Sequence, residues 1–329
     1  MHTILVIALL ALAGPPVQNR PAAAVSPIFR FDTGGFWLNL HHFLYVLGRA
    51  EAKTSDAARV AVAGAPGDAA RGRQQMSAAE QGRWAAAVTA YANGLSLKDA
   101  VFDAPLPSLT GALARAGDAS SLSGAGVDPA AAATLESVAD LYRRLWWPAH
   151  RAANEAWVAS MRPLLAEHGP AVLAYVTRAY ALPWPGDGYP VQVSAWANWA
   201  GAYSTDGNLL VLSSLDAGLA GLLGLETLFH EAMHQWDEPV FRALLEQARG
   251  LGIRISTGIT HAMIFFTAGE AVRSVSPSHV PYADAAGVWG RGMARFKPAL
   301  EEFWKPWLDG RGTRDQALAA LAPRAAIPR

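Results

Sequence analysis

Residues 227–236 have the sequence Thr-Leu-Phe-His-Glu-Ala-Met-His-Gln-Trp. The segment places His230, Glu231 and His234 in the spacing H-E-x-x-H. Residues four apart lie one turn along the same face of a helix, so the two imidazoles can bind one metal ion. Glu231 lies beside that face, where its carboxylate can hold a water next to the ion and act as a general base.

The residues around this motif are apolar. Segment 227–236 has no charge apart from Glu231, and the same helix is lined upstream by leucines. Burying two histidines and a carboxylate without a ligand would cost several kcal/mol. The pattern therefore indicates a helix beneath a ligand-binding cleft. The alternative is a partly exposed helix on which these three polar side chains are only solvated.

The segment resembles the extended signature of zincin metallopeptidases, which requires uncharged residues at the variable motif positions and an apolar residue just beyond. The residues that fit this signature are Leu228, Ala232, Met233, Gln235 and Trp236. A hairpin predicted around Asp206 and Gly207 also resembles the upper part of the zincin domain. The resemblance spans residues 191–273 and implies that an edge strand, here 208–213, receives the substrate backbone by strand addition.

A catalytic zinc site needs a third protein ligand. Resemblance to the gluzincins implies a glutamate on a later helix, and Glu270 is a lone carboxylate in an apolar stretch, 36 positions after His234. The alternative ligand is His261, nine residues before Glu270 and therefore half a turn out of phase on one straight helix. Both can face one ion only if His261 lies in the first turn or in the approach to the helix. The other interpretation of Glu270 is an ion pair with Arg273 or Arg178.

The tetrahedral intermediate of peptide hydrolysis also needs a hydrogen-bond donor for its oxyanion. We expect His261 to line the cleft and supply this donor, and Tyr282 competes for the same role. The alternative for His261 is an ordinary core or surface histidine. Because a pair of histidines with a glutamate suits zinc, we expect Zn²⁺ as the cofactor.

Composition limits the remaining possibilities. The chain has 329 residues, zero net charge, 52% hydrophobic residues and no cysteine. It is long and apolar enough for a sizeable core, and it lacks the clustered basic residues of a nucleic-acid-binding protein. Without cysteine, no disulfide, thiolate metal site or thiol nucleophile can form.

The predicted fold class is α+β and predominantly helical, with a zincin-like catalytic domain and a small sheet above the motif helix. Helical patterns fill residues 25–182, and the zincin-like part covers 183–329, the two forming one continuous globular unit. Pro148 and Pro170 are expected to separate helices. The predicted helices span 36–53, 77–93 and 128–147, the predicted loops 64–75 and 104–126, and the predicted strands 191–196 and 208–213.

The N-terminus has the pattern of a signal peptide. Residues 4–14 form an apolar run too short to span a membrane, followed by small-residue cleavage sites. We therefore expect residues 1–24 to be removed on export to a periplasm or beyond. No later apolar run is long enough for a membrane span.

Together these features predict an exported zinc metallopeptidase that acts on a peptide or protein. The competing hypothesis is a non-catalytic envelope protein that uses the same scaffold for binding, with the metal as a brace. A third is a metal-free helical protein in which the motif arose by chance.

Overall fold

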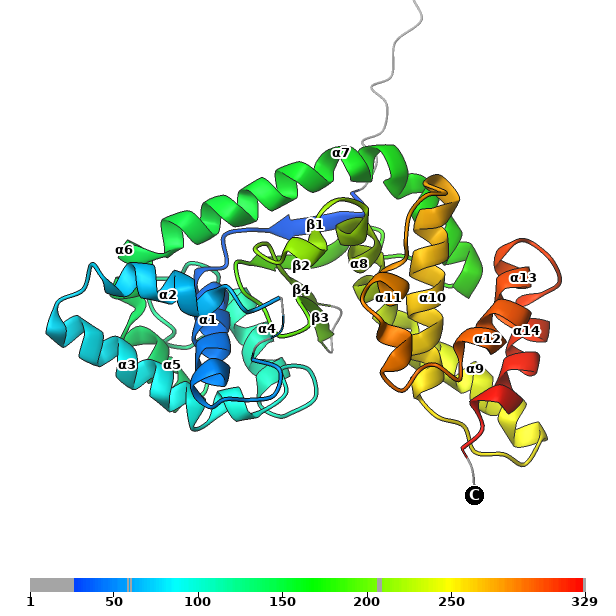
Figure 1. The fold of residues 1–329 in the computed structure, drawn as a ribbon, viewed down its shortest axis with the longest axis horizontal. Coiled ribbons are helices and arrows are strands. Elements are labelled where there is room, and N and C mark those ends of the chain that lie inside the picture. Colours follow the sequence, from blue (N-terminus) through cyan, green and yellow to red (C-terminus); the bar gives the residue numbers. More distant parts are fainter. Residues whose placement is uncertain (1–26, 58, 60, 206–208, 328–329) are drawn as a thin grey trace, which may run out of the picture.

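The protein is described by a computed structural model that covers residues 27–57, 59, 61–205 and 209–327. It is mostly helical with one four-stranded sheet, which confirms the predicted α+β class (Figure 1). The predicted signal peptide, residues 1–24, lies outside the described residues. Among the helices that are described, none has both the length and the apolar character needed to cross a membrane.

The sheet has the strand order β1-β2-β4-β3. Its strands are β1 (Phe29–Asp32), β2 (Tyr189–Ser194), β3 (Ala202–Thr205) and β4 (Leu209–Ser213). Strands β1, β2 and β4 run parallel, whereas β3 pairs antiparallel with β4. This pairing confirms the predicted hairpin, although residues 206–208 of its turn lie outside the described residues.

The prediction that strand 208–213 forms the edge of the sheet is wrong. Strand β4 lies between β2 and β3, so β3 is the edge strand beside the motif helix. The physical reason is visible in its sequence, because four successive apolar residues, 209–212, are typical of a strand covered on both faces.

The helices differ from the predicted pattern in three places. They are α1 (Phe36–Glu51), α2 (Ala65–Arg73), α3 (Ala78–Ala92), α4 (Leu106–Ala116), α5 (Pro129–Glu136), α6 (Ala139–Leu145), α7 (Trp147–Tyr180), α8 (Gly221–Met233), α9 (Asp237–Gly250), α10 (Gly258–Val275), α11 (Tyr282–Ala285), α12 (Lys297–Ala299), α13 (Lys305–Leu308) and α14 (Arg314–Leu321). The expected loops 64–75 and 104–126 contain α2 and α4, and the single helix expected over 128–147 is divided into α5 and α6.

Packing explains one of these differences and a further one in α7. The glycines of segment 64–75 suggested a loop, but a Cβ at Gly72 would lie 2.2 Å from Cε2 of Trp146, so the helix needs glycine there to approach that ring. Helix α7 continues through Pro170, where a new helix was expected to begin, and it also contains Pro163. Its buried residues on both sides of Pro170, among them Met161 and Val176, pack into one core, which outweighs the cost of the proline.

The core consists of two hydrophobic clusters separated by the sheet. Leu210 and Leu212 belong to one cluster, together with α8, α10 and the part of α7 from Trp157 onward. Val211, on the opposite face of the same strand, belongs to the other cluster, together with α1–α6. Figure 1 shows α7 running along the molecule from the N-terminal to the C-terminal helices. Each cluster therefore contains residues from both sides of position 182.

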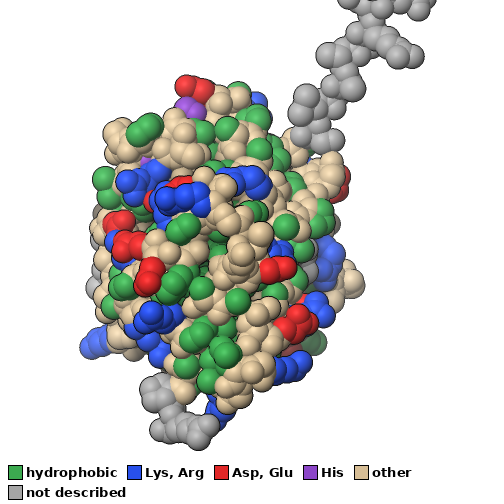
Figure 2. Space-filling model, turned by 90° about the vertical axis from the view of Figure 1, so that its right-hand side faces the viewer, with side chains coloured by type: hydrophobic (Ala, Val, Ile, Leu, Met, Phe, Trp, Pro, Cys, Tyr) green, Lys and Arg blue, Asp and Glu red, His purple; other side chains and the backbone are tan. Residues whose placement is uncertain are grey.

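The surface carries both signs of charge. On the face shown in Figure 2, Lys and Arg side chains are interspersed with Asp and Glu side chains. This mixture agrees with the zero net charge of the sequence.

Candidate metal centre

The motif histidines lie at the end of α8. His230 is in the last turn of the helix, and His234 begins the 3-10 turn that continues it. Leu225, Leu228 and Phe229 pack into the core on the opposite side. The apolar residues therefore fix the helix, and the motif is left facing the space between α8 and α10.

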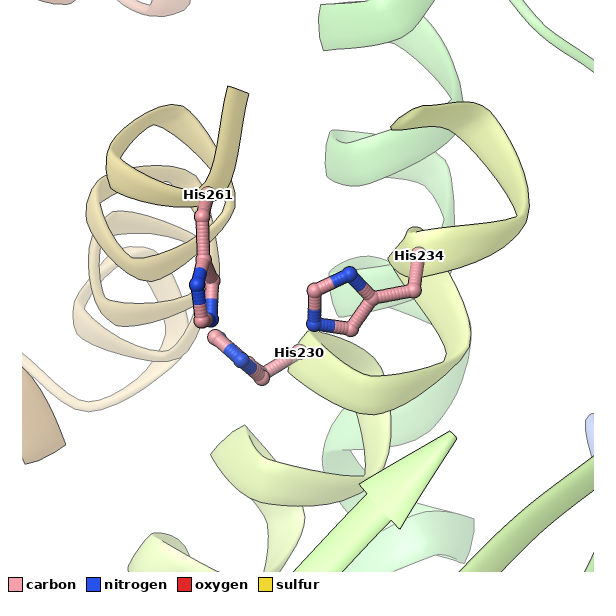
Figure 3. A group of neighbouring side chains, drawn as sticks. All are labelled: His230, His234 and His261. Carbon is pink, nitrogen blue, oxygen red and sulfur yellow. The ribbon is translucent and has the colours of Figure 1, made fainter. Parts of the chain in front are cut away.

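A third histidine comes from α10. His261 lies in the first turn of that helix, which packs against α8. One ring nitrogen from each of His230, His234 and His261 lies within 4.8 Å of the other two. Figure 3 shows the three rings pointing toward one another from the two helices. Three imidazoles at this separation can bind one ion with tetrahedral geometry and leave a fourth position for water or substrate.

The surroundings of these rings fit a metal ion. Nδ1 of His230 is buried and has no hydrogen-bond partner among the described residues. Nδ1 of His234 lies 2.6 Å from Oδ2 of Asp237, the first residue of α9. A carboxylate on one ring nitrogen fixes the tautomer and directs the other nitrogen to a metal, an arrangement found around many protein-bound ions.

The protonation states also favour metal binding for two of the rings. Burial lowers the pKa of His230 well below its usual value, and neighbouring His234 and His261 lower it further. Burial likewise lowers the pKa of His261 to about 4. Both rings are therefore neutral at pH 7, the form that binds metals. Burial lowers the pKa of His234 too, but the hydrogen bond to Asp237 and the charge of Glu231 outweigh it and raise the pKa overall.

Glu231 lies beside this group and below the edge strand. Its Oε1 is 4.0 Å from Nε2 of His230. The Ser204 hydroxyl of β3 lies 3.0 Å from Oε2 and 2.7 Å from the backbone oxygen of Glu231, so it can donate to either. Burial raises the pKa of Glu231, opposed by His234 and by the Ser204 hydroxyl. A buried carboxylate with a raised pKa is suited to taking up and releasing a proton.

The structure does not bring Glu270 to this group. Its Oε1 lies 3.0 Å from Nη1 of Arg273, and its Oε2 lies 3.1 Å from Nζ of Lys305. Glu270, the expected third ligand, is thus paired with two cations, and the alternative residue, His261, lies with the motif histidines. The reason is helix phase, because nine residues separate the two side chains by half a turn. Of the two expected arginine partners, only Arg273 pairs with Glu270, since Arg178 donates to the backbone oxygen of Leu308.

Tyr282 lies near the centre across one aromatic ring. The Phe265 ring is 4.1 Å from that of His230 and 4.7 Å from that of His261, measured between ring centroids. The Tyr282 ring is nearly parallel to Phe265, at 6.3 Å. Burial is the main cause that raises the pKa of Tyr282, so its phenol remains a hydrogen-bond donor at neutral pH.

The sequence prediction missed four residues that contact the site or support it: Ser204, Glu226, Asp237 and His279. Glu226 carried a usable signal, because it is a lone carboxylate in an apolar helix, one turn before His230. Asp237 lies three residues after His234, and its carboxylate contacts that ring.

Comparison with protein-family models, curated proteins and solved structures finds no match to this chain.

Proposed function

We propose that the protein is a zinc-dependent hydrolase, and specifically a metallopeptidase, with His230, His234 and His261 as the metal ligands. The observation that carries the proposal is the group of three imidazole nitrogens within 4.8 Å, with the Glu231 carboxylate beside it. Three histidines and an open position are a known ligand set for catalytic zinc. When bound, zinc would polarise a substrate carbonyl and lower the pKa of a water.

Glu231 supplies the proton transfers. Its carboxylate accepts a proton from the attacking water and delivers it to the leaving amine. The Ser204 hydroxyl, within hydrogen-bond distance of Oε2, holds the carboxylate in place and favours its ionised form. Tyr282 donates a hydrogen bond to the substrate oxygen as negative charge develops on it.

The edge strand supports a peptide as the substrate. Among the described strands, β3 pairs only with β4, so its second edge is not paired with another strand. An extended peptide can add to such an edge through main-chain hydrogen bonds. Because Ser204 of β3 contacts Glu231, a peptide on this edge would pass beside the three histidines.

The test is hydrolysis of a peptide library by zinc-loaded protein, analysed by mass spectrometry. Glu231→Gln should keep the zinc and lose turnover by at least about a hundredfold, because it removes the general base. Glu238→Gln is a matched control, since that carboxylate on α9 is exposed and pairs with Arg242. Cleavage by Glu231→Gln at the rate of the unmodified protein would contradict the assignment.

We also propose that the protein is exported with removal of residues 1–24. The support is the apolar run at 4–14, followed by small residues at 22–24. Expression of the full chain in a bacterium, followed by N-terminal sequencing of the exported protein, tests it. An intact Met1 in a cytosolic product would contradict export.

A further inference from the structure

A buried carboxylate in α8 connects the motif helix to the segment that follows α10. Glu226 lies one turn before His230 and is only 1% exposed. Its Oε2 is 2.6 Å from Nε2 of His279. The backbone N–H of Tyr282 donates to the same carboxylate, at 3.0 Å from Oε1 and 2.9 Å from Oε2.

These contacts account for the burial of Glu226. An unpaired carboxylate in this position would destabilise the fold, so segment 276–282 must stay in place to satisfy it. The same segment packs closely on α10, where a Cβ at Gly269 would lie 2.6 Å from Cβ of Pro281. The segment is therefore held from α8 by hydrogen bonds and from α10 by close packing.

The residue held most directly is Tyr282. The carboxylate of Glu226 binds the N–H of Tyr282 itself, and Pro281 precedes it. This contact fixes the backbone from which the Tyr282 ring extends, nearly parallel to the Phe265 ring at 6.3 Å, and the Phe265 ring in turn lies 4.1 Å from that of His230. We propose that Glu226 and His279 are positioning residues that hold the Tyr282 hydroxyl at the metal centre. This inference rests on the proposed function, because it assigns the Tyr282 hydroxyl to the reacting oxygen.

A double-mutant cycle separates positioning from simple stabilisation. Zinc-loaded Tyr282→Phe should lower kcat about 10- to 100-fold, as expected for loss of one oxyanion donor. Glu226→Gln should lower kcat at least about tenfold with KM changed by less than about threefold, and with zinc content unchanged. The double variant should be no slower than Tyr282→Phe, because Glu226 acts through that hydroxyl. If the losses in kcat from the two changes multiply in the double variant, or if kcat is unchanged in Glu226→Gln, the proposal is wrong.

A second measurement needs no turnover. Acetohydroxamate binding to the cobalt-loaded protein, followed by visible absorption, reports on donors near the metal. Tyr282→Phe and Glu226→Gln should weaken binding by the same factor, and the double variant by no more than either. If the unmodified protein binds the hydroxamate with this pattern but cleaves no peptide, the proposed function fails and the positioning role stands. Equal affinity of Glu226→Gln and the unmodified protein would overturn the positioning role.

Folding of the variants must be checked by circular dichroism. If Glu226→Gln does not fold, Gly269→Ala tests the same relationship from α10. It leaves the carboxylate in place and displaces Pro281, so it should lower kcat and hydroxamate affinity in the presence of Tyr282 but not in Tyr282→Phe. Equal losses in both backgrounds would contradict the proposal.

Discussion

His261 and Glu270 lie nine residues apart on α10 and face different neighbours. One ring nitrogen of His261 is within 4.8 Å of those of His230 and His234. The carboxylate of Glu270 instead lies between Arg273 and Lys305, at 3.0 and 3.1 Å. The same helix thus contributes one side chain to the candidate metal centre and another to an ion-pair cluster.

Glu270→Gln should reduce stability without affecting the metal. The change removes the charge that pairs with both cations, while Arg273 and Lys305 remain partly exposed and can be solvated. We expect a loss of about 1–2 kcal/mol in the free energy of unfolding, measured with urea. Zinc content should equal that of the unmodified protein. A variant that folds but lacks zinc would restore Glu270 as a ligand.

Asp237→Asn should weaken zinc binding. The Asp237 carboxylate lies 2.6 Å from Nδ1 of His234 and fixes the orientation of that ring. Loss of such an outer carboxylate lowers metal affinity by about 10- to 100-fold. Competition with a chromophoric chelator measures the affinity, with the neighbouring Glu238→Gln as control. Equal affinities in Asp237→Asn and the control would show that this contact does not support the site.

Ser204→Ala should move the acidic limb of the pH profile of kcat/KM to higher pH. Burial raises the pKa of Glu231, and the Ser204 hydroxyl opposes this by favouring the ionised carboxylate. Without the hydroxyl the pKa rises further, so activity is lost at a higher pH as the base becomes protonated. The limb of kcat/KM should move upward by up to about one pH unit. A limb that stays in place or moves downward would contradict this role for Ser204.

Removal of the metal should lower the melting temperature. Zinc held by His230, His234 and His261 would join α8 to α10, and it should stabilise the folded chain by about 2.7 kcal/mol when its concentration is a hundred times its dissociation constant. Dialysis against a chelator should therefore lower the melting temperature by several degrees, and added zinc should restore it. Calorimetry that shows no effect of the chelator would favour the metal-free hypothesis.

Local patterns made part of this structure predictable. The H-E-x-x-H helix, the β3–β4 hairpin and the helix predicted over 77–93 depend on residues close in the chain, and each appears in the structure. Strand β1 was missed because its four residues form a strand only by pairing with Tyr189 and the residues after it, far along the chain.

Which side chain of α10 lies beside the motif histidines depends on tertiary contacts. Helix phase showed that His261 and Glu270 cannot both face the ion from one straight helix, but it could not choose between them. The choice follows from what packs against each side of α10. On one side lies α8 with its histidines, and on the other lies Lys305, 35 residues beyond Glu270. The role of Glu226 likewise became visible only once His279 and Tyr282 were placed beside it.

The most direct test of the three-histidine centre is the zinc content of purified protein, measured beside His261→Ala after identical dialysis. About one zinc per chain is expected in the unmodified protein, and a strongly reduced amount in the variant, because a site with two remaining histidines loses much of its affinity. Full zinc in folded His261→Ala, or no zinc in the unmodified protein after supplementation, would contradict the assignment of these three histidines as a metal centre.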